Sequence, residues 1–589
     1  MTIQTLKLKI SGMTCEHCAK TIEKRVSAVE GLISKSVSFL EKEGLFQFDV
    51  EKTSAAEIIK TINSIGNYKV VDEIRDFNHD KVGTKYDLII IGGGSAAFSA
   101  AIKASELGKK VLMINDGLPI GGTCVNVGCV PSKTLIRTAE QFHIANHPNF
   151  SSIKPSESKI NFKEVIRQKT ELVEELRQHK YVDVLKDDPN VTIIKSYGKL
   201  IDKNTVEADG KKFSSENILI ATGSSTFIPD LPGLNETGYL TNETLYELEE
   251  LPEHLIVIGG RYIALENAQM FARLGSKVTI LQRSLRILPD EMPDITESLK
   301  EYLVEEGIEV ITGTKIKSVN KINGKVVINA SVRDEDKVIE GSHIFVATGR
   351  KGNTQGFGLE ELGIELHKNS FIKTNEFLQT SIPNIYAAGD VTGEYLFVYS
   401  AAYEGALAVQ NMFGEDLINN DLSFPRKWES INDEIDSRLS ADKAGLRENN
   451  TTNITFKVKK DYSVFPWVIF TDPQVAGVGM DENQAYKNKI DYEVSTIQLS
   501  DIPRSLAARN TKGFIKLIRN KQTDKLIGAR ILASEGSELL MEISLAIKYG
   551  ITVKELKQMF HPYLTLSEGV KLAAISFDKD VNKLSCCAV

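Results

Sequence analysis

The chain has 589 residues and a formal net charge of −8, and 25% of its residues are charged. This length allows several domains with a large buried core, and the mildly acidic balance argues against the broad basic surface that nucleic acid binding requires. The amino-terminal segment alternates polar and apolar residues, and no later run approaches the ~20 apolar residues of a membrane-spanning helix. We therefore expect a soluble, cytoplasmic protein that has no membrane span and binds no nucleic acid.

The six cysteines are too few for the disulfide framework of a small secreted protein. They fall into three close pairs: Cys15 and Cys18, Cys124 and Cys129, and Cys586 and Cys587. Pairing of this kind indicates chemistry on sulfur, with chance grouping of small buried residues as the alternative.

Residues 1–71 predict a small, ferredoxin-like βαββαβ domain. Strands are expected at 3–10, 33–42, 44–50 and 68–71, and helices at 17–32 and 54–66.

The motif "GMTCEHC" places Cys15 and Cys18 just before the first expected helix, where two thiolates can hold a soft metal ion. Zinc half-site and thioredoxin-like interpretations lack partner cysteines and thioredoxin fold signals. With its glycine, methionine and βαββαβ order, the segment resembles the heavy-metal-associated domain. The resemblance implies a tethered metal carrier.

After a polar linker (72–84), residues 85–115 predict a strand, a glycine-rich turn, a helix and a second strand. Gly92, Gly94 and Ala97 have the spacing that lets a dinucleotide pyrophosphate rest on a helix N-terminus. The second strand ends at Asn115, followed by Asp116, and either side chain could bind a ribose hydroxyl. This unit, 85–231, is the first part of an expected flavin-binding domain.

The stretch "GGTCVNVGCVPSK" follows this unit and carries Thr123, Cys124, Cys129 and Lys133. Two cysteines five positions apart on one helical turn can face each other, form a disulfide and accept two electrons. The alternatives are a zinc half-site, which needs two further ligands, and an inert buried pair. We expect Thr123 to contact the cofactor.

Residues 253–284 repeat the strand, turn and helix plan and predict a second nucleotide-binding domain, 232–349. Gly259 and Ala264 are in place, but Arg261 occupies the middle glycine position. The following strand ends at Gln282 and Arg283, and neither residue is a carboxylate that would repel a 2′-phosphate. The absence of a carboxylate there, with a cation nearby, favours NADPH over NADH.

The remaining chain divides into four expected segments: a second part of the flavin domain (350–414), a polar surface insertion (415–462), an α+β domain (463–577) and a tail (578–589). The α+β domain should contain strands at 467–472, 513–520 and 526–532 and one long helix at 534–550. In the tail, a Cys586–Cys587 disulfide would be strained, because adjacent Cα atoms lie only ~3.8 Å apart and disulfides prefer at least ~4.4 Å. Two neighbouring thiols near the chain end indicate a flexible chelator for a soft metal ion.

From residue 85 to 577 the chain resembles the pyridine nucleotide-disulfide oxidoreductases. The likeness is carried by the dithiol motif, "ATGS" at 221–224, "ATGR" at 347–350, and "TSIPNIYAAGD" ending at Asp390. It implies an α/β fold with two Rossmann-like domains that bind FAD and NAD(P)H, plus a carboxy-terminal dimerisation domain.

The same resemblance implies roles for single residues. Asp390 would hold the flavin's ribityl chain, and Tyr262 would gate the nicotinamide pocket. Cys124 would be the outer, exchanging thiol and Cys129 the inner thiol beside the flavin. The remaining implied feature is an ion pair near the flavin N5, formed by Lys133 and Glu266.

Disulfide-reducing members of the family carry a catalytic histidine near the carboxy terminus. Here "HPYLTLSEG" places Tyr563 at that position, and His561 lies two residues away. A phenol with a pKa near ~10 is a poor base at neutral pH. Together with the metal motif and the tail, this segment resembles the metal-reducing branch of the family.

That branch reduces Hg(II) to volatile Hg(0) for mercury detoxification, and the resemblance implies a homodimer with shared active sites. The carboxy-terminal cysteines of one subunit would deliver the ion to the dithiol of the other, assisted by Tyr181 and Tyr563. Two alternatives stay open. One is a thiol-disulfide reductase, similar to dihydrolipoamide dehydrogenase or glutathione reductase, with an added metal domain. The other is a metal-sequestering protein with a vestigial flavin domain.

Overall fold

The computed structural model describes residues 3–13, 16–39, 42–66, 68–74, 84–419 and 457–580. The predicted metal ligands Cys15, Cys586 and Cys587 lie outside these ranges, as does most of the predicted insertion. Among the described helices, none is both long and apolar enough to cross a membrane.

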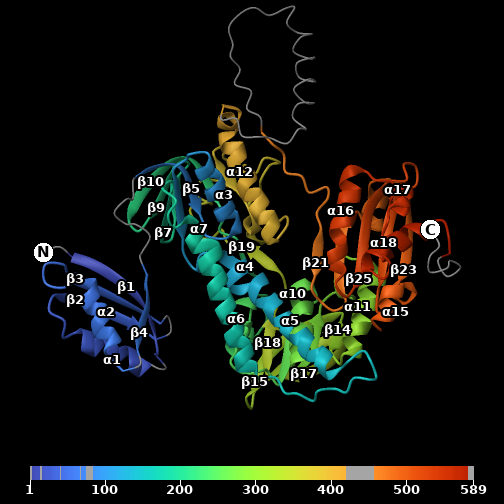
Figure 1. Ribbon diagram of the computed structural model, residues 1–589, viewed down its shortest axis with the longest axis horizontal. Helices are drawn as coiled ribbons and strands as arrows, with labels where there is room; N and C mark the ends of the chain where they lie inside the picture. Colours follow the sequence, from blue (N-terminus) through green and yellow to red (C-terminus); the bar gives the residue numbers. More distant parts are fainter. Residues whose placement is uncertain are drawn as a thin grey trace, which may run out of the picture.

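The amino-terminal domain is a four-stranded antiparallel sheet with strand order β2-β3-β1-β4, carrying two helices (Figure 1). Its elements are β1 (Ile3–Ser11), α1 (Glu16–Val26), β2 (Leu32–Ser38), β3 (Glu43–Asp49), α2 (Ala55–Asn63) and β4 (Lys69–Ile74). Alternate residues of β1, namely Leu6, Leu8 and Ile10, are buried at 2% exposure or less, as a strand with one covered face requires. Helix α1 ends at Val26 and not at residue 32 as predicted, because the chain turns over residues 27–31 before β2 begins, with Gly31 at a φ of +89°.

The flavin-type domain is built on a sheet with the order β7-β6-β5-β10-β9-β8, and β20 adds to β10. Its elements are β5 (Lys85–Ile91), α3 (Ser95–Glu106), β6 (Val111–Asn115), α4 (Gly122–Val127), α5 (Cys129–Asn146), α6 (Phe162–Arg177), η2 (Gln178–Val182), α7 (Asp183–Leu185), β7 (Val191–Lys195), β8 (Lys199–Asp202), β9 (Thr205–Ala208), β10 (Lys211–Ile220), β11 (Ser224–Thr226), β19 (Arg350–Gly352), η3 (Lys368–Ser370), β20 (Ile385–Ala387), η4 (Asp390–Thr392) and α12 (Val398–Asn419). Helix α12 packs beside α3 (Figure 1). Gly405 allows the close approach, because a Cβ there would lie 2.1 Å from the carbonyl oxygen of Ala96.

The second nucleotide domain has a parallel sheet of order β14-β13-β12-β18 and an antiparallel sheet formed by β15, β16 and β17. Its elements are α8 (Leu234–Thr237), α9 (Asn242–Leu245), β12 (His254–Ile258), α10 (Tyr262–Leu274), β13 (Lys277–Gln282), α11 (Pro293–Glu305), β14 (Glu309–Thr312), β15 (Thr314–Ile322), β16 (Lys325–Val332), β17 (Glu335–Gly341) and β18 (His343–Val346). Strands β12 and β13 are buried at every residue after the first, as expected for a parallel sheet covered on both faces.

The carboxy-terminal domain is a five-stranded antiparallel sheet with the order β21-β22-β25-β24-β23. Its elements are β21 (Trp467–Ile469), β22 (Gln474–Gly479), α14 (Glu482–Lys487), β23 (Tyr492–Gln498), η6 (Leu499–Asp501), α15 (Pro503–Ala507), β24 (Phe514–Asn520), β25 (Leu526–Ala533), η7 (Gly536–Leu539), α16 (Leu540–Tyr549), α17 (Val553–Gln558) and α18 (Leu566–Ile575). The predicted helix at 534–550 starts as a 3₁₀ turn and is α-helical only from Leu540, because Glu535 adopts a φ of 56°.

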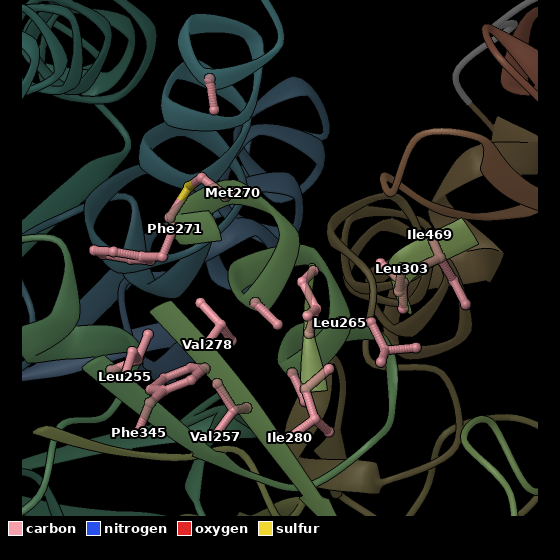
Figure 2. Packing of buried hydrophobic residues seen from close by; sticks show 14 of the residues in the cluster. Leu255, Val257, Leu265, Met270, Phe271, Val278, Ile280, Leu303, Phe345 and Ile469 are labelled. Carbon is pink, nitrogen blue, oxygen red and sulfur yellow. The ribbon is translucent and has the colours of Figure 1, made fainter. Parts of the chain in front are cut away.

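One apolar cluster joins the three large domains. It contains Leu135 of α5, Leu265 and Phe271 of α10, Phe345 of β18 and Ile469 of β21. Figure 2 shows the α10 side chains over the strands of the second nucleotide domain, with Ile469 at the edge of the same core. Shared packing of this kind fixes the junction at which side chains from three domains meet.

Candidate active site

The glycine turn after β5 opens onto a cavity of about 680 Å³. Gly92 has a φ of +133°, and a Cβ there would lie 2.2 Å from the carbonyl oxygen of Ala221. A Cβ on Gly122 would lie 2.7 Å from the Cα of Gly94, so the turn also packs against the start of α4. The backbone at the N-terminus of α3 is therefore exposed to the cavity without side-chain obstruction, as a dinucleotide pyrophosphate requires. Ala97 lies behind this wall, fully buried in α3.

The second unit repeats this construction. Gly259 has a φ of +129°, and a Cβ there would lie 2.3 Å from the carbonyl oxygen of Ala347. The alanines of "ATGS" and "ATGR" thus close equivalent turns in the two nucleotide domains. Arg261 caps α10 in extended conformation, and its guanidinium forms an ion pair with Asp290 at the surface.

Other residues predicted for the second nucleotide site lie nearby on α10 and β13. Ala264 is fully buried in α10, Gln282 is buried with its amide 3.4 Å from the carbonyl oxygen of Arg286, and Arg283 is exposed. The pKa of Tyr262 is raised by burial, and its ring stacks with Phe397 at a centroid distance of 6.4 Å.

Polar side chains predicted to contact the cofactor lie on the wall of the large cavity. Asn115, Asp116, Thr123 and Asp390 all belong to its wall. The amide of Asn115 donates to the carbonyl oxygen of Leu118 at 3.1 Å, whereas Asp116 is exposed.

Asp390 is oriented by two residues that the sequence analysis did not identify as site residues. The Ser224 hydroxyl donates to Asp390 Oδ2 at 2.8 Å, and Arg350 Nε donates to the Ser224 hydroxyl at 2.7 Å. Burial raises the pKa of Asp390, and the charge of Arg350 opposes that rise. Both residues belong to the "ATGS" and "ATGR" motifs, which were the available signal.

The dithiol spans two helices, which corrects the expectation of one helical turn. Cys124 lies in α4, and Cys129 is the first residue of α5. Gly128 interrupts the helix with φ −129° and ψ −114°, and a Cβ there would lie 2.8 Å from the carbonyl oxygen of Thr123. Both sulfur-bearing residues line the large cavity.

The two thiols have opposite electrostatic environments. The pKa of Cys129 is lowered to about 7 by its hydrogen bond with Cys124, and the charge of Lys133 acts in the same direction against burial. The pKa of Cys124 is raised by the same hydrogen bond and by burial. At neutral pH the Cys129 sulfur is therefore substantially thiolate, and the Cys124 sulfur keeps its proton.

Lys133 and Glu266 form the predicted ion pair, with Nζ and Oε2 2.8 Å apart. Lys133 lies one turn after Cys129 on α5, and Glu266 projects from α10. Glu266 is only 6% exposed, and its second carboxylate oxygen accepts the backbone N–H of Phe470 at 2.8 Å. The pair therefore joins all three large domains.

Tyr181 lies beside the dithiol helix on the π-helical turn η2. Its ring packs edge-on against Phe98 at 5.0 Å, and a Cβ on Gly121 would lie 3.3 Å from its ring. Burial raises the pKa of Tyr181, and the charges of both active-site sulfurs act in the same direction. Single π-helical turns occur frequently at functional sites, but their sequence signal is too weak to predict one here.

Tyr399, a further phenol that feels the charge of Cys129, was not anticipated. Its pKa is raised by burial and by the charge of Cys129, and its hydroxyl donates to the carbonyl oxygen of Pro466 at 2.6 Å.

Two residues near the predicted site's carboxy-terminal segment, Tyr563 and His561, lie between α17 and α18 of the carboxy-terminal domain. Tyr563 is 52% exposed. His561 is directed to Glu542 of α16, with Nε2 and Oε1 2.6 Å apart, and its side chain is only 5% exposed.

In the amino-terminal domain, Cys18 lies in the first turn of α1 and is 9% exposed. Met13 of the same motif is 5% exposed and belongs to the domain core. The motif's methionine thus anchors the loop that precedes the helix.

Comparison with known protein families gives a separate match for each of three parts of the chain. Residues 86–405 match the family model described as pyridine nucleotide-disulphide oxidoreductase, residues 465–574 match its dimerisation domain, and residues 7–68 match the heavy-metal-associated domain. The predicted fold class is thereby confirmed.

Relatives that match over the whole chain show which branch of this family the chain belongs to. The chain is 40% identical over 590 residues to a mercuric reductase of Lysinibacillus sphaericus, covering 99% of each chain, and 39% identical to one of Staphylococcus aureus, covering 100% of each. A solved HOCl-induced flavoprotein disulfide reductase, RclA of Escherichia coli, superposes with a TM-score of 0.69 at 27% identity, covering 84% of this chain and 99% of that one. The whole-length identity, the dithiol and the amino-terminal metal domain together show that this chain belongs to the mercuric reductase family of pyridine nucleotide-disulphide oxidoreductases.

Proposed function

We propose that the chain reduces Hg(II), presented as thiol complexes, to volatile Hg(0) for mercury detoxification in the cytoplasm, with NADPH as the electron donor and FAD as the bound cofactor. The observation that carries this proposal is the Cys124/Cys129 pair on the wall of the large cavity, in a chain that matches mercuric reductases over its whole length. The reaction balances as Hg(II) + NADPH → Hg(0) + NADP⁺ + H⁺.

The glycine cradle, the helix N-terminus and the polar wall of the cavity fit a dinucleotide. FAD, when bound, would supply the two-electron link between NADPH and the dithiol. Its proposed contacts are Gly92, Gly94, Ala97, Thr123, Asp390, Lys133 and one of Asn115 and Asp116. NADPH would bind the second domain through Gly259, Tyr262, Ala264, Gln282 and Arg283.

The dithiol suits the metal because thiolates are the preferred ligands of soft ions. Cys129 provides a thiolate near neutral pH, and Cys124 would release its proton when the ion binds. While both sulfurs hold the ion they cannot form a disulfide with each other, so the electron pair is directed to the metal. The neutral product no longer binds thiolates.

Tyr181 and Tyr563 would assist the transfer as protonated phenols, and Tyr563 would come from the partner subunit of a homodimer. This arrangement is supported by the raised pKa of Tyr181 and by the match to the dimerisation domain. The ion would pass from Cys15 and Cys18 to the carboxy-terminal pair and then to the partner's dithiol. Each step exchanges one mercury–sulfur bond for another.

The test is NADPH consumption by the purified, flavin-loaded chain, measured separately with Hg(II) in excess thiol, with lipoamide and with oxidised glutathione. Metal-dependent turnover with elemental mercury vapour is expected. Turnover with a disulfide only would identify a disulfide reductase, and no turnover with any acceptor would indicate a metal-sequestering protein.

A further inference from the structure

Phe470 makes two different contacts with the Lys133–Glu266 ion pair. Its backbone N–H donates to Glu266 Oε1 at 2.8 Å, and its ring centroid lies 4.7 Å from Lys133 Nζ. An ammonium over an aromatic face is attracted by the ring quadrupole, and the attraction grows when water is excluded. One residue of the carboxy-terminal domain therefore binds both members of an ion pair that comes from the other two domains.

The position of Phe470 separates this role from ordinary core packing. Ile469, the preceding residue, is 4% exposed and belongs to the apolar cluster shared by the three domains. Phe470 instead lines a small cavity of about 50 Å³ whose wall includes Lys133 and Glu266. Successive residues at the end of a strand point to opposite sides, so the hydrophobic anchor and the contact to the ion pair are divided between neighbours.

The contacts leave little freedom to the pair. Glu266 Oε2 accepts Lys133 and Oε1 accepts Phe470, so both carboxylate oxygens have partners in a nearly buried site. Lys133 keeps a side-chain exposure of 32%, and the ring covers one flank of its ammonium. Without the ring, the flexible lysine stem would be held by the carboxylate alone.

We propose that Phe470 is a positioning residue of the redox centre: its ring and its N–H together hold the Lys133 ammonium and the Glu266 carboxylate beside the dithiol helix. Docking of the carboxy-terminal domain thus completes the electrostatics of a site built on the two nucleotide domains. The proposal rests on the proposed function only in taking the ion pair to act on the flavin and dithiol.

The test uses the flavin-loaded, full-length chain and compares Phe470→Leu with Phe470→Tyr. The first readout is the rate at which an amine-acylating reagent modifies Lys133, followed by mass spectrometry. The ring attracts the ammonium and covers one flank of it, so losing the ring should raise this rate roughly 3- to 30-fold. The second is NADPH-dependent bleaching of the flavin in a single turnover, which should slow in Phe470→Leu and be retained in Phe470→Tyr.

Phe413→Leu is the matched control. The Phe413 ring makes the same kind of contact with a lysine elsewhere in the chain, with Lys109 Nζ 5.0 Å from the ring centroid. This variant should change labelling of Lys109 and leave Lys133 unchanged. If Phe470→Leu does not fold, Phe470→Met replaces it, being of similar size without a ring. Wild-type labelling of Lys133 and wild-type bleaching in a folded ringless variant would overturn the proposal. Neither readout uses mercury, so a failure of the mercury assay is a separate result.

Discussion

At the residue scale, the two active-site sulfurs differ because they share one hydrogen bond. This hydrogen bond lowers the pKa of Cys129 and raises the pKa of Cys124. The charge of Lys133, one helical turn further along α5, lowers the pKa of Cys129 as well. A nucleophilic sulfur and a proton-carrying sulfur are thus available at the same pH.

Cys124→Ala is expected to raise the pKa of Cys129 from about 7 toward its ordinary value of 9.0, because the largest lowering cause is removed. The ultraviolet absorbance of the thiolate, followed against pH, measures this change. Cys18→Ala is the control and should leave the titration unaltered. An inner thiol that still titrates near 7 in the Cys124→Ala variant would contradict the assignment.

Glu404 is a buried carboxyl group outside the catalytic scheme. It lies in α12 and is 0% exposed. Its carboxylate accepts the backbone N–H of Gly389 at 2.6 Å and the hydroxyl of Tyr462. Gly389 directly precedes Asp390, so the first of these hydrogen bonds links Glu404 to the turn that carries Asp390. Burial raises its pKa from 4.5 to about 7, with Tyr462, Gly389 and Lys460 opposing the rise. A single glutamate in an apolar helical stretch was a sequence signal for this group.

Because the folded chain holds this proton more tightly than the unfolded chain, the associated stability is full below pH 4.5 and is lost as pH rises through about 7. The difference corresponds to roughly 3 kcal/mol at pH well above 7. Glu404→Gln should therefore weaken the decline of the melting temperature between about pH 4.5 and 7, the range in which the folded and unfolded chains differ in protonation of this group. Glu365→Gln, at an exposed pair with Lys373, is the control. Equal slopes in wild type and Glu404→Gln would contradict the prediction.

At the element scale, the break between α4 and α5 decides how the sulfurs meet. Gly128 approaches the backbone of Thr123 too closely for a side chain. A continuous helix would instead place residues five positions apart on different faces.

Gly128→Ala is expected to destabilise the chain by about 1–3 kcal/mol, because the backbone must shift to admit a methyl group. It should also slow formation of the Cys124–Cys129 disulfide. Urea unfolding and the rate of thiol loss under mild oxidation measure the two effects. Gly210→Ala, where nothing lies within 4 Å, is the control for backbone strain alone. Unchanged oxidation kinetics in Gly128→Ala would show that the break is not needed to bring the sulfurs together.

Several element boundaries escaped prediction because single residues override periodicity. The apolar spacing continues through residues 27–32 and 534–539, yet α1 ends at Val26 and α16 starts only at Leu540. Gly31 and Glu535, within these two segments, adopt positive φ. Strands β22 and β23 were missed because their alternation is weak, and they are stabilised by pairing with β25 and β24, which lie far along the chain.

At the scale of the whole molecule, the carboxy-terminal domain presents a group of exposed apolar side chains. They are Met541, Leu545, Tyr549, Met559, Phe560, Tyr563 and Leu564, and Phe560 is 100% exposed. Clusters of exposed apolar side chains mark protein interfaces. The cluster agrees with the match of this domain to a dimerisation domain.

Phe560→Glu is expected to weaken the proposed homodimer at least about tenfold, because a charge would be buried at its interface. Mercury turnover should fall with it, since Tyr563 and the carboxy-terminal cysteines would act in the partner subunit. Flavin reduction by NADPH should be preserved. Sedimentation measures the dimer and absorbance measures the flavin. Lys487→Glu, at an exposed position of α14 in the same domain, is the control. A stable, active dimer of Phe560→Glu would contradict this arrangement.

The tail offers a second test at this scale. Replacing Cys586 and Cys587 together by alanine is predicted to reduce mercury turnover in thiol excess, because the relay to the inner dithiol is lost. Reduction of the flavin by NADPH should remain normal. Equal loss of both activities would count against the delivery role.

The sequence by itself determined the chemistry and the order of domains. Glycine spacing, paired cysteines and apolar strand runs are local patterns, and each reflects a backbone or side-chain requirement that neighbouring residues satisfy. Only the tertiary structure decided which distant residues meet: Ser224 and Arg350 at Asp390, Tyr181 at the dithiol helix, and Phe470 at the ion pair. These contacts join residues far apart in the chain, and they depend on how three domains pack around one apolar cluster, which no local pattern encodes.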